Sequence, residues 1–417
     1  MPVAGTEESP KTSDIPIAEY RSLLSKFLIR LCVTVTLGVI FLVLGELFSF
    51  RRHPPNARDI MMGPVRIQLS SATASEREYW RQYEAADTFT YQPYVLWRRK
   101  PFQGSMISVS EDGIRRTLHT KCDDRSFTIW MFGDSTLWGS GATDDQTIPS
   151  FLAGEFEREG RNVCVVNYGE GGWANTQEVI ELIEKLKHTA RKPNVVIFYD
   201  GGTEAFTAYQ SRQADMPTNY SSFKNYLDGW SAEQKPGFAY LQKTNTHRYL
   251  EEMAQKLTRH GKNTSAMTDD EVEALAGNIL QNYQQNMDIV GLLAQHFGFR
   301  AIFTWYPVLV VGHKQLTPDE QKAELLQEQN LPGVTRVYRA AYGLCEQAHL
   351  QNLYYLGDLF DDQKRSLFEG IAHLKPEGNR IVADRLFQIL EDPSRRPRNS
   401  SGSSQLGHRQ HVRGKPV

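Results

Sequence analysis

The sequence predicts an α/β fold built on a parallel β-sheet. Short apolar segments, rich in β-branched and aromatic residues and most of them ending at Gly or Pro, lie at 127–133, 163–169, 195–201, 300–307 and 353–360. Continuous apolar runs of this kind are typical of strands that are covered on both faces. Amphipathic helix patterns separate them at 147–159, 176–188 and 278–297, and another helix begins at Thr317. Alternating strands and helices indicate right-handed crossovers, with ligands bound beyond the carboxyl ends of the strands.

The composition excludes several classes of function. The chain has 417 residues, with 47 Lys and Arg against 49 Asp and Glu, so the formal net charge is -2. This balance produces no overall field that would attract nucleic acid, and no nucleic-acid partner is expected. The four cysteines form no CxxC pair, and we expect neither a metal nor another cofactor.

One segment near the N-terminus is apolar enough to predict a membrane helix. Residues 31–50 carry a single charge, Glu46, and a helix of that length reaches about 30 Å, the thickness of a hydrocarbon core. We predict a transmembrane signal anchor at 27–50. A cleaved signal peptide is an alternative, but the segment ends in bulky residues where cleavage requires small ones. A buried core helix is another, although residues 1–26 hold nothing to pack around it.

The anchor sets the expected organisation of the rest. A short N-terminal tail stays in the cytoplasm while residues 53–417 are exported, so the main domain is predicted on the extracytoplasmic side, periplasmic or extracellular. No disulfide among the exported cysteines can be assigned from sequence, and Cys164, in a core strand, fits a small buried hydrophobe. The predicted divisions are a cytoplasmic tail (1–26), the anchor (27–50), a stalk and N-terminal extension (51–125), the main domain (126–392) with a helical insertion at about 207–277, and a disordered basic tail (393–417).

A Gly-rich turn after the first predicted strand carries a candidate nucleophile. It reads FGDSTLWGSG, and Ser135 stands where the strand gives way to a loop and helix. The pattern alone also fits an anion-binding turn or a helix cap. No lysine follows the glycines as in a P-loop, and the spacing of a dinucleotide site is absent. A serine nucleophile needs a base within hydrogen-bond reach and donors for the oxyanion that forms.

The candidate base lies far downstream. His373 stands in EGIAHLKPEGNR, just before a predicted helix with Pro376 in its first turn. A histidine there can reach across the carboxyl edge of the sheet. The alternative is a surface histidine beside a helix cap, which most of the eleven histidines are expected to be.

Four sequence blocks, in order, resemble those of the SGNH (GDSL) hydrolase superfamily. They are FGDS around Ser135, NYGEGG at 167–172, YDGG at 199–202 and HLKPEGNRIVADRL from His373, and the likeness covers about 90–390. The resemblance implies a three-layer α/β/α, flavodoxin-like hydrolase that cleaves or transfers ester-bound acyl groups. It implies Ser135 as nucleophile, oxyanion donors at the N–H groups of Ser135 and Gly172, and His373 as general base and then acid.

Two positions depart from the pattern of this superfamily. Thr203 replaces an oxyanion-hole Asn, and its hydroxyl can still donate but has a shorter reach. Gly370 replaces the Asp three residues before the histidine. Glu369 is then the first candidate to orient the imidazole, and the other candidates are Asp361, Asp362 or a backbone carbonyl.

The sequence therefore predicts a membrane-anchored serine esterase that needs no cofactor and acts on acyl esters, O-acetyl esters among them, of a surface glycan or lipid. One alternative is an O-acyltransferase acting on a surface glycan. Another is a degenerate SGNH-like binding domain, favoured by Thr203 and Gly370. Trp138 and Trp173 suit either stacking on a sugar ring or shielding the site from water. Trp305 and Tyr306 suit either an acyl pocket or the core.

Overall fold

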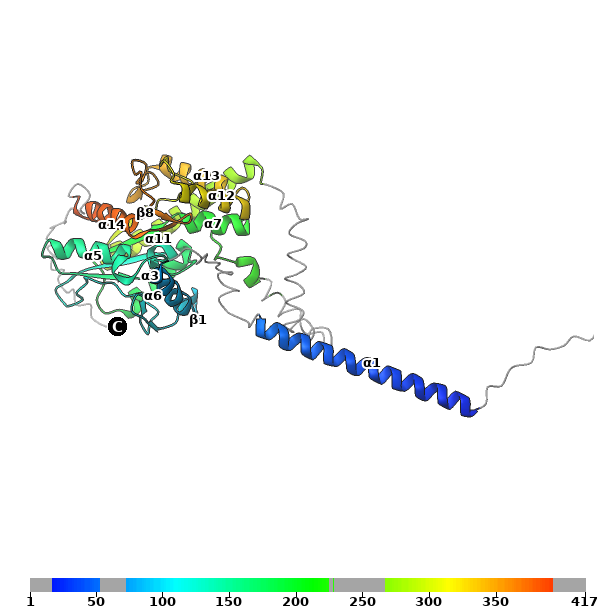
Figure 1. Cartoon of the computed structure of the whole chain (residues 1–417). Coiled ribbons are helices and arrows are strands. Elements are labelled where there is room, and N and C mark those ends of the chain that lie inside the picture. The colour runs from blue at the N-terminus through cyan, green and yellow to red at the C-terminus, as the bar shows by residue number, and fades with distance from the viewer. Residues whose placement is uncertain (1–16, 53–72, 225–227, 229–266, 393–417) are drawn as a thin grey trace, which may run out of the picture. The chain divides into compact units, whose positions relative to one another are not determined.

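The computed structural model describes residues 17–52, 73–224, 228 and 267–392 (Figure 1). The chain divides into two units. One unit comprises Met1–Asp59 and Lys224–Ser265, and the other comprises Ile60–Phe223 and Ala266–Val417.

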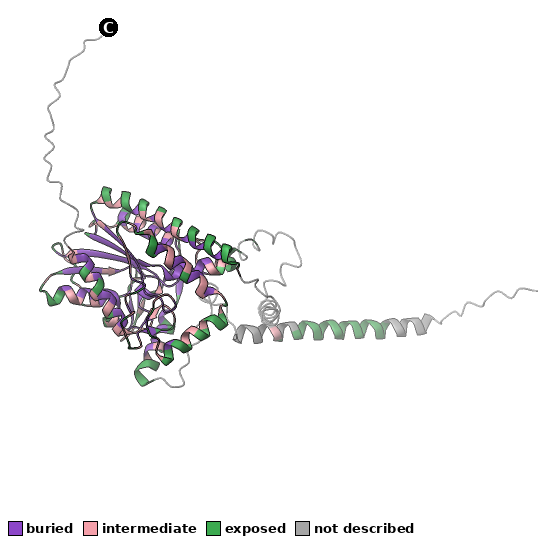
Figure 2. Cartoon of the chain, turned by 90° about the horizontal axis from the view of Figure 1, so that it is seen from above, coloured by how far each residue is buried: buried purple, intermediate pink, exposed green. Residues whose placement is uncertain are grey.

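The first unit contains one long helix, α1 (Ile17–Arg52), which runs through the whole of the predicted anchor. Residues 25–41 of this helix are exposed (Figure 2). They include large apolar side chains such as those of Phe27 and Phe41. No helix within the described residues combines the length and the apolarity needed to cross a membrane. The crossing of a membrane by residues 27–50 stays a prediction.

The second unit is centred on a five-stranded sheet in which every neighbouring pair is parallel. The order β6-β5-β7-β8-β9 corresponds to 2-1-3-4-5, the flavodoxin-like order. The predicted α/β fold with a parallel sheet is confirmed, and all five predicted segments form strands. Most end before the predicted Gly or Pro, because that residue already begins the turn. The strands are β5 (Phe127–Gly133), β6 (Val163–Asn167), β7 (Val195–Asp200), β8 (Arg300–Trp305) and β9 (Leu353–Tyr355).

Helices cover both faces of this sheet. The chain runs from β5 outward to β6 and then back past β5 to β7, and right-handed crossovers therefore send the connecting helices to opposite faces. On one side α5 (Ile148–Arg158) packs against α14 (Pro376–Glu391). The other group of mutually contacting helices comprises α6 (Asn175–His188), α7 (Gly202–Ser211), α11 (Asp269–Phe297) and α13 (Val334–Ala348).

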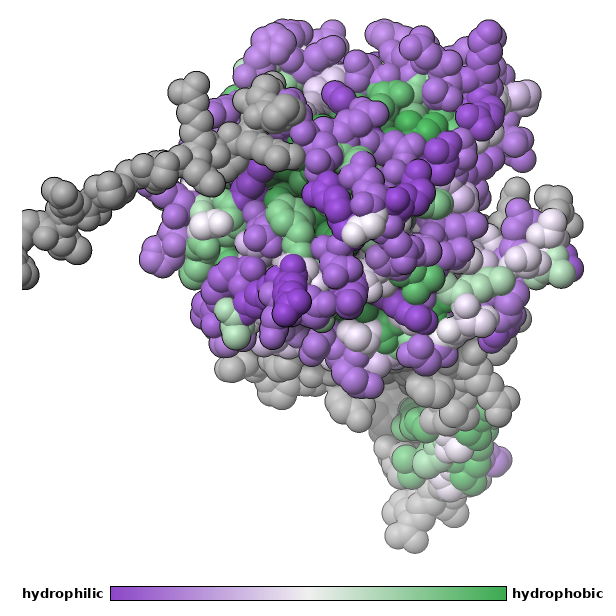
Figure 3. All heavy atoms as spheres, turned by 90° about the vertical axis from the view of Figure 1, so that its left-hand side faces the viewer, coloured by the Kyte–Doolittle hydropathy of each residue, from purple (hydrophilic) through white to green (hydrophobic). Residues whose placement is uncertain are grey.

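The core lies between these layers. Figure 2 shows the strands buried and the outer turns of the helices exposed. The face of the molecule in Figure 3 is mostly hydrophilic, with hydrophobic residues in small separate areas. The predicted helix start at Thr317 is also found, because Thr317 and Glu320 form a capping box at the start of α12 (Pro318–Asn330).

Residues 73–125 of the N-terminal extension belong to the second unit and pack against its main domain. The elements of the extension are α3 (Ala74–Ala86), the hairpin β1 (Phe89–Gln92) and β2 (Leu96–Arg99), and the pair β3 (Phe102–Gln103) and β4 (Ser108–Val109). Its side chains form two small clusters with the main domain, Tyr79 and Tyr83 with Trp138, and Trp97 with Trp173. Its strands have only two to four residues, too few to show a period in the sequence. Of the predicted stalk and extension (51–125), residues 53–72 lie outside the described residues.

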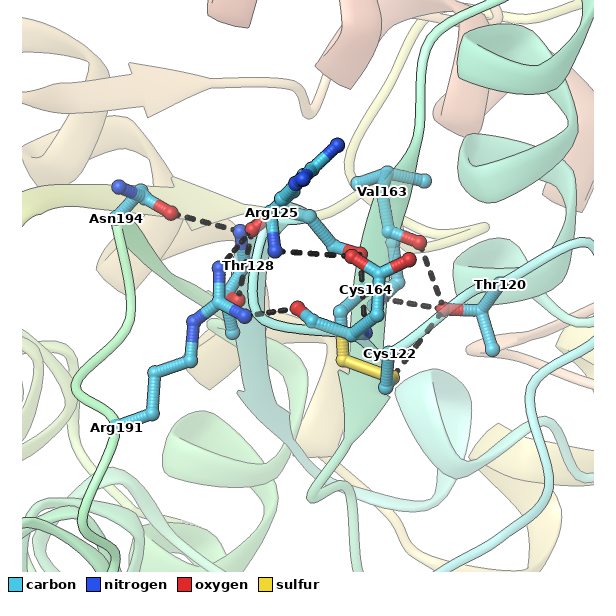
Figure 4. The surroundings of a disulfide bond; sticks show 11 residues. Thr120, Cys122, Arg125, Thr128, Val163, Cys164, Arg191 and Asn194 are labelled. Carbon is cyan, nitrogen blue, oxygen red and sulfur yellow. Dashed lines mark hydrogen bonds between the residues drawn. A yellow bond between two sulfur atoms is a disulfide. The ribbon is translucent and has the colours of Figure 1, made fainter.

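A disulfide links the end of the extension to the edge strand of the sheet. Cys122 and Cys164 are bonded, with their Cα atoms 4.6 Å apart (Figure 4). Beside the bond, the Thr120 hydroxyl donates to the carbonyl oxygen of Val163 at 3.2 Å. The expectation that Cys164 is a free cysteine was wrong, because the extension, whose fold the sequence did not predict, brings Cys122 alongside β6. Among the described residues, Cys32 and Cys345 are free.

The predicted insertion is described only at its two ends. On one side α7 ends at Ser211, and on the other α11 begins at Asp269, so part of the segment predicted as insertion belongs to a core helix. Residues 229–266 lie outside the described residues, as does the predicted tail at 393–417.

Candidate active site

Ser135 occupies the turn after β5, the strand that lies between β6 and β7 in the sheet. Gly133 ends that strand, and a Cβ atom there would lie 2.7 Å from the carbonyl oxygen of Tyr199, so the close pairing of β5 with β7 requires glycine. Asp134 then caps the short helix α4 (Ser135–Trp138) by accepting the N–H of Thr136 at 2.6 Å. Ser135 is the first helical residue, a position whose N–H has no partner inside the helix. It stands where the strand order reverses, the usual place for a ligand in such sheets.

His373 meets Ser135 at this edge. The Oγ atom of Ser135 lies 2.8 Å from Nε2 of His373, although the two residues are 238 positions apart. His373 comes from the small hairpin of β10 (Phe368–Glu369) and β11 (His373–Leu374). Burial lowers the pKa of the imidazole, the charge of Asp134 opposes this effect, and the charge of Arg99 adds to it. A neutral ring with its proton on Nδ1 is the form that can accept the Ser135 proton at Nε2.

Among the described residues, no carboxylate forms a hydrogen bond or ion pair with the other imidazole nitrogen, Nδ1. Within the described residues, no hydrogen bond is formed by Nδ1 of His373. Glu369 is its backbone partner in the hairpin, yet no hydrogen bond joins the two side chains. Asp361 accepts the backbone N–H of His313 at 2.7 Å, and Asp362 is exposed. Gly370 has a φ of 90°, and a Cβ atom there would meet nothing within 4 Å.

Asp134 is the acidic residue whose charge acts on the imidazole of His373. Besides capping α4, its carboxylate accepts hydrogen bonds from the hydroxyl groups of Thr203 and Tyr306, and it is almost completely buried. Thr203 therefore points at Asp134, which differs from the expectation that its hydroxyl would serve the oxyanion hole. Sequence reasoning assigned Asp134 no role, although its place directly before the nucleophile was the available signal.

The loop after β6 supplies the second group of backbone donors. Its start lies beside the nucleophile turn, because the N–H of Glu170 donates to the carbonyl oxygen of Gly133 at 2.9 Å. Gly172 has a φ of 74°, a left-handed conformation that favours glycine. In the described part of the chain, the N–H of Gly172 forms no hydrogen bond. The loop that carries Gly172 thus begins beside the turn that carries Ser135.

A cluster of buried acids lies beneath this edge of the sheet. Burial raises the pKa of Asp200 to about 7 and that of Glu204 to about 8. Burial and the neighbouring Asp200 raise the pKa of Glu178 well above its usual value. Tyr283 donates to Asp200 at 2.8 Å. The apolar patterns around Glu178 gave no sign that it faces inward, and sequence reasoning missed it.

The large aromatic side chains near the site are buried and expose no ring face to a ligand. Trp138, Trp173 and Trp305 are completely buried and Tyr306 nearly so. Trp138 contacts the guanidinium of Arg99, whose Cζ lies 3.8 Å from the ring centroid. Of the two roles considered for these tryptophans, stacking on a sugar is therefore wrong, because neither Trp138 nor Trp173 reaches the surface. Burial likewise places Trp305 and Tyr306 in the core.

The described residues contain no group of three or more His, Cys, Asp or Glu side chains that could hold a metal ion.

Comparison with models of known protein families and with curated protein sequences finds no match.

Several solved structures show a distant similarity to this chain. One is a member of the lipolytic protein G-D-S-L family from Veillonella parvula, 13% identical, covering 64% of this chain and 98% of that chain, with a TM-score of 0.33. An acetyl xylan esterase, AlAXEase, is 12% identical over 63% of this chain and 99% of that one, with a TM-score of 0.31. The psychrotrophic esterase EstA from Pseudoalteromonas sp. is 10% identical over 64% and 97%, with a TM-score of 0.30. Similarities at this level establish neither a family nor an activity for this chain.

Proposed function

We propose that this protein is a serine esterase that hydrolyses acyl esters through an acyl-enzyme. The observation that carries the proposal is the 2.8 Å contact between Ser135 Oγ and His373 Nε2 at the carboxyl edge of a parallel sheet. A hydroxyl paired with a neutral imidazole beside free backbone donors is the arrangement that acyl transfer requires. The four sequence blocks that resemble the SGNH superfamily support the same reaction.

The reaction proceeds in two halves. His373 Nε2 takes the Ser135 proton as Oγ attacks the ester carbonyl, and the N–H groups of Ser135 and Gly172 donate to the oxyanion. The imidazolium then protonates the leaving alcohol, which departs and leaves the acyl group on Ser135. In the second half, water attacks this acyl-enzyme while His373 takes its proton. Collapse of the oxyanion releases the carboxylic acid and returns the proton to Ser135.

Asp134 substitutes in part for the missing carboxylate at Nδ1. Its charge acts on the imidazole across the site and favours the imidazolium that forms during each half of the reaction. It does not fix the ring through a hydrogen bond, as a triad carboxylate does. We therefore propose a turnover below that of a complete triad, in which loss of the orienting acid costs about 10⁴ in kcat.

We further propose that the domain acts outside the cytoplasm on acyl esters of a surface glycan or lipid, O-acetyl esters among them. The exposed apolar side chains of α1 suit a membrane anchor. The Cys122–Cys164 disulfide suits an oxidising compartment. Two measurements test this location: retention of the full chain in membranes washed with alkaline carbonate, and proteolysis of the domain from outside intact cells. Release by carbonate, or protection from protease, contradicts it.

Covalent labelling of Ser135 is the direct test of the activity. A fluorophosphonate probe should label the full chain stoichiometrically, and short-chain acyl esters should be hydrolysed. Ser135→Ala should abolish both signals, whereas Ser140→Ala, in the same turn, should preserve them. Hydrolysis that survives in Ser135→Ala would remove this residue from its role.

The alternative that a specific observation favours is a binding domain without catalysis. Nδ1 of His373 forms no hydrogen bond within the described residues, and the hydroxyl of Thr203 is already used by Asp134. A domain of this kind would bind an acylated ligand and leave it intact. Absence of fluorophosphonate labelling on the folded protein would support this alternative against the esterase.

A further inference from the structure

The orientation of one peptide unit decides whether the proposed oxyanion hole is formed. The N–H of Gly172 and the carbonyl of Gly171 belong to the same trans peptide, so they point in opposite directions. Any group that holds the Gly171 oxygen therefore also fixes the direction of the Gly172 N–H. The indole N–H of Trp97 donates to that oxygen at 2.9 Å. This inference rests on the esterase function proposed above.

Trp97 is itself held rigidly. It lies in β2 of the N-terminal extension, is completely buried, and stacks on Phe223 with ring centroids 5.8 Å apart. Trp173 and Val95 pack in the same cluster. A hydrogen bond in such a dry environment is not replaced by water when it is lost, and its donor has no other position to occupy.

The other polar groups around this peptide are also bound. The N–H of Gly171 donates to a Glu170 oxygen at 2.8 Å, and the Nε–H of Arg99 donates to the same oxygen at 3.1 Å. The carbonyl of Gly172 accepts the hydroxyl of Thr218 at 2.7 Å. Within the described residues, the N–H of Gly172 is thus left without a partner between two fixed peptides. This is the pattern expected of a donor kept ready for a developing oxyanion.

We propose that Trp97 is a positioning residue that aims the Gly172 N–H at the oxyanion. The contact also gives the extension a part in the reaction, because a segment before the main domain sets the geometry of a loop after its second strand. Without the indole N–H, the Gly171–Gly172 peptide can rotate about its flanking bonds, and its donor no longer points at the reacting carbonyl. The loss then falls on the transition state rather than on substrate binding.

Trp97→Phe tests this, since it keeps an aromatic ring in the cluster and removes the donor. We expect kcat to fall by roughly 10- to 100-fold, less than the 10²–10³ for removal of a donor, with little change in KM. Affinity for an aryl trifluoromethyl ketone, which forms an oxyanion on Ser135, should fall by the same factor. Trp305→Phe is the matched control: Trp305 is equally buried, and its indole N–H has no hydrogen-bond partner in the part of the chain that the structure describes. It should leave kcat and ketone affinity near the values of the wild type.

A second variant covers the case in which Trp97→Phe fails to fold. Replacement of Trp97 by benzothienylalanine keeps the shape of the ring and lacks only the N–H, and it should give the same losses in a folded protein. Wild-type kcat and ketone affinity in either folded variant would overturn the proposal. If the wild type itself neither hydrolyses esters nor reacts with fluorophosphonate, the esterase function fails instead, and the two failures are therefore distinguishable.

Discussion

The two sides of the candidate site are held very differently. On the nucleophile side, the turn around Ser135 and the loop around Gly172 are tied to the extension and to each other by buried hydrogen bonds and ion pairs. The guanidinium of Arg99, for example, forms ion pairs with both Asp87 and Glu170 and also contacts the ring of Trp138. On the histidine side, His373 lies in a two-residue hairpin strand, and among the described residues its ring forms one hydrogen bond, to Ser135.

This difference follows from what each side has to do. An oxyanion donor acts only if it already points at the position where charge will develop, so it needs a rigid surrounding. A base needs reach, the right protonation state and a nearby charge, and burial together with Asp134 supplies the last two. The site has rigid donors and a sparsely held base.

Removal of the base should have the largest effect. In His373→Ala the Ser135 hydroxyl has no proton acceptor, and kcat should fall by roughly 10⁴- to 10⁶-fold, as in serine hydrolases that lose their histidine. Steady-state hydrolysis of a short-chain acyl ester measures this, with the thermal midpoint as a check on folding. Activity above a hundredth of the wild-type value would show that His373 is not the base.

Loss of the disulfide should weaken the tie between the extension and the sheet. Cys122→Ser/Cys164→Ser should lower the free energy of unfolding by roughly 2–4 kcal/mol, because the bond closes a loop of 42 residues. The bond lies at the start of β6, whereas the Gly172 loop follows the other end of that strand, so kcat should change little. Reductant should lower the Tm of the wild type to that of the double variant and leave the double variant unaffected. A fall in kcat without a fall in stability would contradict this.

Neutralising Asp134 should weaken the base without removing it. Asp134→Asn keeps the cap of α4, since Asn caps as well as Asp, but loses the charge that opposes the lowering of the His373 pKa. We expect kcat to fall about 10- to 100-fold, because a base with a lower pKa accepts the Ser135 proton less readily. The acid limb of kcat/KM depends on neutral imidazole, whose pKa burial already lowers in the wild type, and should move to still lower pH in the variant. An unmoved limb would mean that Asp134 acts through Ser135 alone.

The buried acids on the nucleophile side should make stability depend on pH. The raised pKa values of Asp200, about 7, and Glu204, about 8, mean that the native state holds protons which the unfolded state has lost. Their contribution is full below about pH 4, the unfolded pKa, and declines as pH rises towards 8. Glu178→Gln removes one such acid, so its Tm should fall less between pH 6 and 9, by roughly 2–4 °C. Parallel pH curves for variant and wild type would refute this.

The sheet could be predicted because each strand is a continuous apolar run with a turn residue behind it. The extension could not, because its order comes from long-range contacts of single side chains: Trp97 with Gly171, and Arg99 with Glu170. No local pattern marks a two-residue strand or a buried arginine. The partner of Cys164 was missed for the same reason.

For the site, sequence blocks identified the residues that touch but not the ones that support them. The contact of Ser135 with His373 was expected from the order of the blocks along the chain. The use of the Thr203 hydroxyl by Asp134 was not, since it depends on side-chain directions above the sheet. A position that sequence blocks assign to the oxyanion hole can therefore hold a side chain that is directed at another group.

Of these changes, replacement of Glu369 should have the smallest effect on kcat. A small effect would show that this carboxylate does not hold the imidazole, in contrast to the firmly held nucleophile side. The sequence made it the first candidate to orient the imidazole, and its Cα lies opposite that of His373 in the hairpin. Burial raises its pKa, but the charges that act on it are those of Lys375, Glu76 and Asp319 rather than the imidazole. Glu369→Gln should therefore change kcat by less than about twofold and leave the acid limb of kcat/KM in place, within the range of an ordinary surface substitution. A tenfold fall with a lower acid limb would instead make Glu369 the missing triad member and the histidine side as firmly held as the other.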